Sequence, residues 1–223
     1  MTQLPLSLVL PDEADIKDFF VTQANQLAFG WIEKWPDWPA PYQSVNIYGP
    51  KGCGKSHLGA LFGAKLHCKT LTSLTEFDRD LLASFDGYIL DSVSMEAAWD
   101  EIALFHFFNY LSETGKSAYI TSVEALSQMP WRLPDLASRI RAIAAQKVDM
   151  PDDDLLAALL DSYFANRQCQ VAEPVMRYIL ARVDRSYEAV AELARAIDHI
   201  SLAEKKPVTI ALIKELFQSS DDQ

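Results

Sequence analysis

The stretch GPKGCGKS, residues 49–56, constrains the fold of this chain more than any other part of its sequence. It matches the pattern G-x-x-x-x-G-K-[ST] at every fixed position, and loops with this pattern wrap around phosphate groups. The preceding run, SVNIY, is short and contains β-branched residues, and a glycine follows it at once, which predicts a buried strand that enters a turn. Small and apolar residues then recur at helical spacing from Lys55 to about Leu66. Because the motif requires a strand before it and a helix after it, the sequence predicts a phosphate-binding loop in an α/β fold.

The residue types of this loop indicate how it would hold a nucleotide. Its glycines let the backbone curl so that N–H groups face a phosphate, and the following helix adds the positive end of its dipole. We expect Lys55 to reach the β- and γ-phosphates and the hydroxyl of Ser56 to bind Mg²⁺. Cys53 and His57 belong to the same stretch and are candidate nucleotide contacts, although packing is favoured over a chemical role for both side chains. ADP or ATP, with Mg²⁺, is therefore the expected cofactor.

A second apolar strand, GYILDS, supplies an acid that should lie beside the loop. Asp91 ends its apolar run and is expected to hold the metal together with Ser56. Many related ATPases carry a second carboxylate at the next position to polarise the attacking water, but here that residue is Ser92. A serine cannot act as a general base near neutral pH, and losing such a base costs a factor of about 10²–10⁴ in rate. Glu96, Asp100 and Glu101 are alternative sources of a carboxylate; without one, we expect little intrinsic ATPase activity.

The order of elements predicts two structural units. Strands SVNIY, GYILD and SAYITS alternate with helical patterns such as AWDEIALFHFFNYLSETG, which favours a parallel sheet covered on both faces. Past about residue 150 only helical patterns follow: PDDDLLAALLDSYFANR, EPVMRYILARV, YEAVAELARAIDHISLAEK and TIALIKELF. We therefore expect an N-terminal peptide (1–10), an α/β domain (11–150) and a small all-helical domain (151–223).

Composition limits the classes of partner. The net charge of −11 opposes binding to a phosphate backbone, and no basic run exceeds the pair Lys205-Lys206, so direct DNA binding is disfavoured. Apolar runs are broken by charge before the roughly 18 residues that a membrane span needs, and the N-terminus lacks the basic flank of a signal peptide. Three cysteines without C-x-x-C spacing favour a reducing compartment. We expect a cytoplasmic protein.

Several stretches resemble the DnaA/Hda family of AAA+ proteins in their order along the chain. DFFVTQANQLA is similar to the family segment that walls the adenine pocket, NIYGPKGCGKSHL to its strand, loop and helix start, and TGKSAYITS to its sensor 1 strand. LPDLASRI resembles the box that carries the arginine finger, which would be Arg139, and the helical tail resembles the lid. From the phosphate-loop motif and from this resemblance together, the residues expected to contact the nucleotide are Gly49, Gly52, Cys53, Gly54, Lys55, Ser56, His57, Asp91 and Ser122.

The opening stretch QLPLSL resembles the peptide with which members of this family bind the sliding clamp. The contact residues expected from this resemblance are Gln3, Leu4, Leu6 and Leu8. Pro5 favours an extended backbone, in which the three leucines fall on one side at a spacing of two. The alternative is an edge strand of the protein's own sheet, continued by the two apolar residues that follow.

The resemblance implies regulatory inactivation of replication initiation, in which a clamp-bound regulator stimulates ATP hydrolysis by the initiator DnaA through an arginine finger in trans. Two residues depart from the family pattern: Ser92, and Glu188 or its neighbour Tyr187 where a lid arginine would approach the phosphates. Arg139 also has a purely structural alternative, pairing with Asp135 or with solvent. Rival functions are a small P-loop kinase and a DNA-binding initiator or helicase-loader ATPase; the acidic charge and the absence, in this sequence, of the family's DNA-binding domain disfavour the latter. Self-association stays open.

Overall fold

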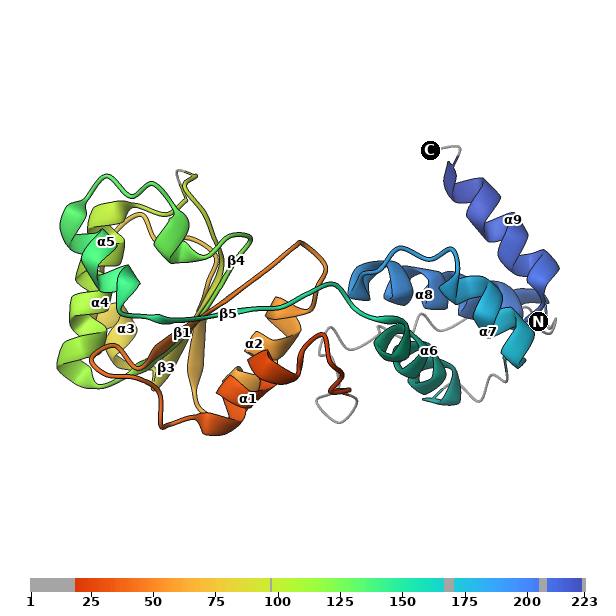
Figure 1. Ribbon diagram of the computed structural model, residues 1–223, viewed down its shortest axis with the longest axis horizontal. Coiled ribbons are helices and arrows are strands. Elements are labelled where there is room, and N and C mark those ends of the chain that lie inside the picture. Colours follow the sequence, from red (N-terminus) through yellow and green to blue (C-terminus); the bar gives the residue numbers. More distant parts are fainter. Residues whose placement is uncertain (1–18, 97, 167–170, 205–207, 222–223) are drawn as a thin grey trace, which may run out of the picture.

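A computed structural model describes residues 19–96, 98–166, 171–204 and 208–221 (Figure 1). Its first part is a five-stranded sheet in the order β2-β3-β4-β1-β5, in which all neighbouring strands are parallel. The strands are β1 (Ser44–Tyr48), β2 (Cys68–Leu71), β3 (Gly87–Val93), β4 (Ser117–Ser122) and β5 (Ala144–Lys147). The helices of this part are α1 (Gln26–Lys34), α2 (Lys55–Gly63), α3 (Arg79–Ala83), α4 (Glu101–Thr114) and α5 (Pro134–Arg141), with a 3₁₀ turn, η2, at Leu126–Gln128.

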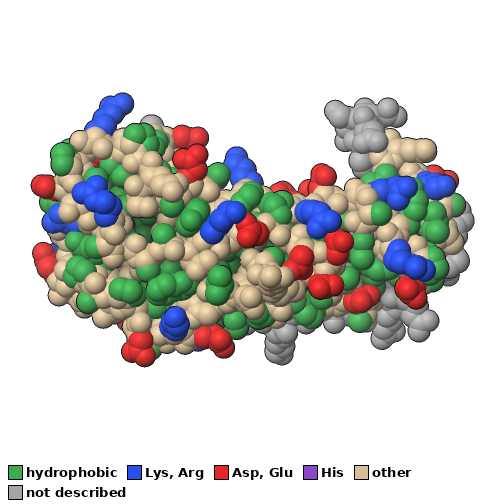
Figure 2. Space-filling view, viewed as in Figure 1, with side chains coloured by type: hydrophobic (Ala, Val, Ile, Leu, Met, Phe, Trp, Pro, Cys, Tyr) green, Lys and Arg blue, Asp and Glu red, His purple; other side chains and the backbone are tan. Residues whose placement is uncertain are grey.

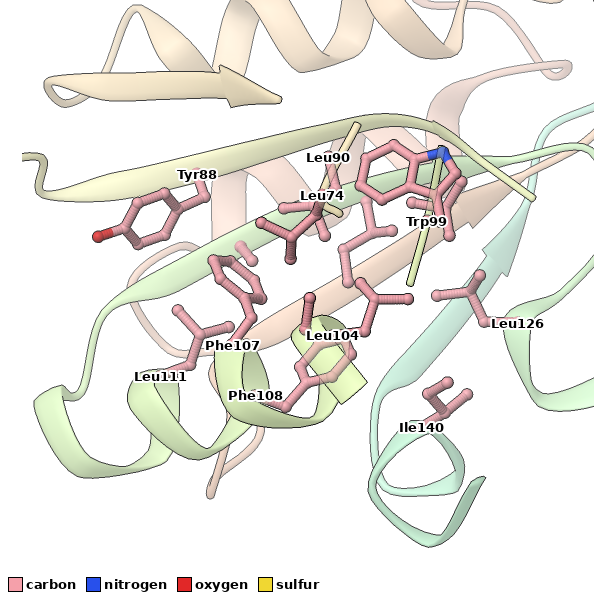
Figure 3. Packing of buried hydrophobic residues seen from close by; sticks show 14 of the residues in the cluster. Leu74, Tyr88, Leu90, Trp99, Leu104, Phe107, Phe108, Leu111, Leu126 and Ile140 are labelled. Atoms are coloured by element: carbon pink, nitrogen blue, oxygen red, sulfur yellow. The ribbon is translucent and has the colours of Figure 1, made fainter. Parts of the chain in front are cut away.

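Successive side chains of the central strands enter two different cores. Tyr88 and Leu90 of β3 and Ile120 of β4 pack with α4 and α5 on one face (Figure 3), whereas Ile89 and Tyr119, the intervening residues, pack with α1 and α2 on the other. All five side chains are at most 8% exposed. Because side chains alternate across a strand, a sheet covered on both faces buries both sets of side chains, so its inner strands are rich in apolar residues.

Local sequence sets the ends of the longest helix in this part. Asp100 is the N-cap of α4, since its carboxylate accepts hydrogen bonds from the N–H groups of Ile102 and Ala103, both at 2.9 Å. Gly115 follows the helix in the left-handed conformation (φ +67°) and donates its N–H to Leu111. The helix therefore begins three residues later than the apolar pattern AWDEIAL alone suggests.

The second part contains helices only. They are α6 (Asp153–Asn166), α7 (Glu173–Leu180), α8 (Tyr187–Glu204) and α9 (Ile210–Asp221). Asp152 caps α6 by accepting the N–H of Leu155 at 2.8 Å, as the acidic run at 152–154 predicts. These helices enclose a hydrophobic core of their own, around fully buried side chains such as Leu160, Ile179 and Ile197.

The predicted architecture, a parallel α/β sheet flanked by helices and followed by a small all-helical part, is confirmed. The edge strands β2 and β5 and the short helix α3 were not predicted, because their sequences carry no clear apolar period. Gln3, Leu4, Leu6 and Leu8 lie outside the described residues, so their role stays a prediction. Within the part of the chain that is described, no helix combines the length and the apolar character that crossing a membrane requires.

Candidate nucleotide-binding site

The phosphate loop runs from the carboxyl end of β1 to the start of α2. Tyr48 ends the strand and Lys55 begins the helix, so the loop lies at the edge of the sheet where β3 and β4 also end. Gly52 and Gly54 adopt positive φ angles of +78° and +93°, which residues with a Cβ rarely take. The loop is therefore formed as the motif predicts, with the N-terminal end of α2 facing the space above it.

Lys55 is nearly buried and turns back over its own loop. Its ammonium group donates hydrogen bonds to the carbonyl of Gly49 at 2.8 Å and to that of Pro50 at 2.6 Å. Its side chain is 9% exposed, and the same group lies 3.6 Å from the sulfur of Cys53. A buried ammonium needs such partners, and these acceptors hold the charge beside the position that a phosphate would take.

Cys53 and His57 are both packed into the protein. Cys53 is 2% exposed, and burial raises the pKa of its thiol although the neighbouring Lys55 opposes this shift. The imidazole of His57 stacks between the rings of Phe19, at 5.3 Å, and Tyr187, at 5.7 Å. Burial lowers the pKa of His57, so the neutral ring is favoured. These surroundings give each residue a packing role that needs no nucleotide.

Asp91 lies beside the loop, as the motif requires. The hydroxyl of Ser56 donates to its Oδ1 at 3.0 Å, and the hydroxyl of Thr121 donates to the same oxygen at 2.6 Å. Carboxylate and hydroxyl oxygens are the ligands that Mg²⁺ prefers, and it is usually bound through one or two protein groups together with a substrate phosphate. Among the described residues no group of three His, Cys, Asp or Glu side chains could hold a metal alone. The donor set thus fits a nucleotide-bound Mg²⁺, which Ser56 and Asp91 would hold.

Thr121 is a site residue that the sequence analysis missed. It is fully buried on β4, donates its hydroxyl to Asp91, and accepts the N–H of Ser92 at 2.6 Å. Ser92 has a left-handed backbone (φ +62°), and the pairing of β3 with β4 shifts register between Leu90 and Val93. This irregularity lies near the end of β3, at Ser92, the position where related ATPases carry a second carboxylate. A hydroxyl residue one position before the end of a buried strand is the only sequence signal that could have indicated Thr121.

Ser122 lines the site, but its hydroxyl has partners within the protein. It donates to the carbonyl of Glu124 at 2.6 Å and accepts from the amide of Asn46 at 2.8 Å. Asn46 in turn accepts the N–H of Leu126 at 3.0 Å. This network fixes the turn after β4, so Ser122 shapes the site through the backbone; a direct contact with nucleotide stays a prediction.

A cavity of about 590 Å³ opens above the loop. Lys55, Ser56 and Ser92 lie on one wall, and Tyr187 and Glu188 of the helical part lie on another. Its wall also carries the carboxylates of Glu96 and Glu124 and the ammonium of Lys51. The cavity therefore carries two lysines and three glutamates, Glu96, Glu124 and Glu188. Of the predicted nucleotide contacts, Gly49, Cys53 and Asp91 do not line it.

The three acids considered as replacements for the missing carboxylate have different roles. Asp100 caps α4, as described above. Glu101 accepts the backbone N–H groups of Arg132 at 3.2 Å and Leu133 at 2.7 Å. Only Glu96 of the three lines the cavity.

The segment expected to wall an adenine pocket lies beside α2. Phe19 stacks on Phe29 at 5.2 Å as well as on His57, and Asn25 donates to the carbonyl of Phe20 at 2.9 Å. Residues 19–28 of this segment do not line the cavity. The segment approaches the site indirectly, because Phe19 stacks on His57, which stacks in turn on Tyr187.

Arg139 lies on α5 and does not line the cavity. Its guanidinium donates to the side-chain oxygen of Asn109 at 2.9 and 2.6 Å and to the carbonyl of Asp135 at 3.2 Å. It also lies 4.2 Å from the ring centre of Phe105. These contacts within the chain agree with the structural alternative, in which Arg139 pairs near Asp135, and the role of arginine finger stays a prediction.

Comparisons with known proteins agree with this geometry. Residues 152–217 match the family model described as "Hda, lid domain". An uncharacterized protein of Haemophilus influenzae is 24% identical over 230 residues, covering 96% of this chain and 97% of its own.

Solved structures show the same fold. Domain III of the Thermotoga maritima replication initiation protein DnaA gives a TM-score of 0.72 at 21% identity, covering 90% of this chain and 95% of its own. AMPPCP-bound DnaA from Aquifex aeolicus gives 0.70 at 18% identity, covering 93% of this chain and 69% of its own. A RuvB mutant from Thermotoga maritima gives 0.67 at 12% identity, covering 91% and 71%. The helical part of this chain thus resembles the Hda lid domain, and the chain as a whole has the fold of DnaA domain III.

Proposed function

We propose that this protein regulates chromosomal replication initiation in the cytoplasm by stimulating ATP hydrolysis on the initiator DnaA while bound to the sliding clamp. The observation that carries the proposal is a combination of three features: a match to the Hda lid-domain model, a complete phosphate loop, and Ser92 on β3 where related ATPases carry a catalytic carboxylate. Such a protein is suited to hold ADP or ATP with Mg²⁺ and hydrolyse it slowly or not at all. The AMPPCP carried by a DnaA of the same fold supports an adenine nucleotide.

Arg139 is assigned the chemical contribution. An arginine delivered in trans to a phosphoryl-transfer site stabilises the charge of the transition state and raises the rate by a factor of about 10³–10⁵. Arg139 is away from its own cavity and its planar guanidinium is held by Asn109, which presents it from α5. Self-association through the same surface is part of the proposal.

The N-terminal peptide is assigned the clamp contact. Gln3 and the leucines at positions 4, 6 and 8 would enter an apolar pocket on the clamp, each buried leucine contributing about 1.5–3 kcal/mol before ordering costs. This suits a micromolar contact that a second attachment to DnaA strengthens. Direct sequence-specific DNA binding is not proposed: on the face shown in Figure 2 basic side chains are scattered among acidic ones, and the net charge is −11.

A phosphate-release assay tests the proposal in three mixtures: the protein alone, the protein with DnaA, and the protein with DnaA and clamp loaded on DNA. We expect strong release only in the third. The double variant Gln3→Ala, Leu4→Ala should lose clamp binding in a pull-down while its thermal melt stays unchanged, and it should lose stimulation as well. Rapid hydrolysis by the protein alone, or turnover of a small phosphate acceptor, would instead support an ATPase or kinase.

A further inference from the structure

The first turn of α8 rests directly on the phosphate loop. The backbone N–H of Tyr187 donates to the carbonyl of Gly52 at 3.1 Å. A Cβ atom on Gly52 would lie 2.6 Å from the Cβ of Ser186, and one on Gly54 would lie 2.5 Å from the ring of Tyr187. Real Cβ atoms essentially never approach so closely, so the lid fits against the loop only because both positions are glycine.

The side chain of Tyr187 contacts three other parts of the protein. Its ring packs against Gly54 and stacks on His57 at an interplanar angle of 19°. His57 stacks in turn on Phe19. Burial raises the pKa of the Tyr187 hydroxyl, although a hydrogen bond with Asn25 opposes the shift, so the hydroxyl stays protonated at neutral pH. One lid residue thus touches the loop, α2 and the segment before α1.

The hydrogen bond from Tyr187 also fixes the orientation of a loop peptide. In a trans peptide the carbonyl and the next N–H point in opposite directions. Because the carbonyl of Gly52 points at the lid, the N–H of Cys53 points away from it. Phosphate loops bind anions through successive N–H groups that face the same way, so each peptide held in this orientation is one donor already set for a phosphate oxygen.

We propose that Tyr187 is a positioning residue for the phosphate loop: its N–H holds the Gly52 carbonyl outward, and its ring locks the contact through Gly54 and His57. The proposal rests on nucleotide binding at this loop, part of the function proposed above. It assigns the affinity for the phosphate groups of a nucleoside diphosphate partly to the lid. In this proposal the lid acts on the loop through a backbone hydrogen bond. The next residue, Glu188, is negatively charged and cannot itself bind phosphate.

Three substitutions at one position separate the N–H from the ring. Ser186 caps α8 by accepting the N–H of Ala189 at 3.0 Å, so Tyr187 is the first residue of the helix, where proline is well tolerated. Tyr187→Pro removes the N–H and the ring, Tyr187→Ala removes the ring alone, and Tyr187→Phe retains both. Thermal melts without nucleotide report whether each variant is folded.

The affinities for ADP and for adenosine, which has no phosphate groups, provide the decisive comparison. We expect Tyr187→Pro to weaken ADP binding about tenfold, the upper range for a neutral hydrogen bond, and Tyr187→Ala to weaken it less. The affinity for adenosine should change by less than about twofold, and Tyr187→Phe should bind ADP like the wild type. Unchanged ADP binding in the proline variant, or an equal loss for adenosine, overturns the proposal, because a loss through the base or the lid alone would affect both ligands.

Amide hydrogen exchange of residues 51–56 tests the same contact without any ligand. Exchange at these residues should rise about tenfold in the proline variant relative to Tyr187→Phe, because the loop loses the contact that holds it. If the wild type binds no ADP while exchange still rises, the nucleotide part of the proposed function fails but the positioning role stands. Equal exchange in the two variants overturns the positioning role, whatever nucleotide the protein binds.

Discussion

The hydroxyl of Ser56 donates a 3.0 Å hydrogen bond to Oδ1 of Asp91, which joins the phosphate loop to the end of β3. The two residues are 35 positions apart in the sequence, and Thr121 on β4 donates to the same carboxylate oxygen. Three elements therefore meet at one carboxylate, next to the place where the loop would hold a β-phosphate.

Replacing Asp91 by Asn should remove the effect of Mg²⁺ on nucleotide binding. The carboxylate is the charged member of the proposed metal-binding pair, and an amide is a much weaker ligand for a hard dication. ADP titrations of wild type and Asp91→Asn, each with Mg²⁺ and with excess chelator, would measure this. A wild-type preference for Mg²⁺-ADP that persists in the variant would mean that Asp91 is not a metal-binding residue.

The left-handed backbone of Ser92 predicts an unusual gain in stability. A residue with a Cβ at a φ of +62° is strained by about 1–2 kcal/mol, and glycine is not, so Ser92→Gly should stabilise the protein by about 0.5–1 kcal/mol. The N–H bond to Thr121 is retained because it belongs to the backbone.

Gly115→Ala is the matched control for this change. Gly115 has a similar φ of +67°, and nothing lies within 4 Å of the Cβ that alanine would add, so its cost of about 1 kcal/mol is due to the backbone alone. Urea unfolding should show shifts of opposite sign for the two variants. Destabilisation by Ser92→Gly would show that the serine side chain makes contacts that outweigh the strain.

The sequence predicted the strands that form short runs rich in apolar and β-branched residues. SVNIY, GYILD and SAYITS are inner strands buried on both faces, so most of their residues are apolar, and buried polar residues such as Asn46 and Thr121 have hydrogen-bond partners. CKTL and AAQK form the edge strands, which are partly exposed and need no such pattern. They follow from the pairing of strands, which no local pattern contains.

The candidate site divides in the same way. The phosphate loop and Asp91 were predictable because a fixed spacing encodes a local backbone shape, and an acid at the end of an apolar strand must lie at the same sheet edge. The hydrogen bond between Tyr187 and Gly52 was not, because it depends on how the helical part docks against the sheet. Thr121 was missed for a similar reason, since its role depends on the bulge at Ser92.

His57 should make stability depend on pH below neutrality. Burial lowers the pKa of the folded state below the usual value of 6.5, so the fold favours the neutral ring. Its contribution is fully present above pH 6.5 and is lost as the pH falls through the folded-state pKa, because the unfolded chain then binds more protons.

The variant His57→Phe keeps a stacked ring between Phe19 and Tyr187 but does not titrate. The free energy of unfolding of the wild type minus that of the variant should therefore decrease between pH 7.5 and pH 5, by at most about 1.4 kcal/mol per pH unit. Carboxylates outside this stack titrate in both proteins and cancel in the difference. A difference that is constant or increases toward low pH would contradict the assignment of a buried neutral imidazole.

Replacing Arg139 by alanine should abolish the stimulation of DnaA without weakening the clamp contact. In the proposed function the guanidinium completes a neighbouring phosphoryl-transfer site, so its loss should lower the stimulated rate by a factor of about 10³ or more. Arg139→Lys retains the charge but loses the planar guanidinium, so it should restore little of the stimulation.

Arg141→Ala is the matched control. Arg141 is exposed on the same helix, and its replacement by alanine removes an equal charge. Phosphate release by DnaA with loaded clamp, measured beside thermal melts of each variant, separates this role from a structural one. Full stimulation by Arg139→Ala, or an equal loss in Arg141→Ala, would leave Arg139 as a residue that only packs α5 against Asn109 and Phe105.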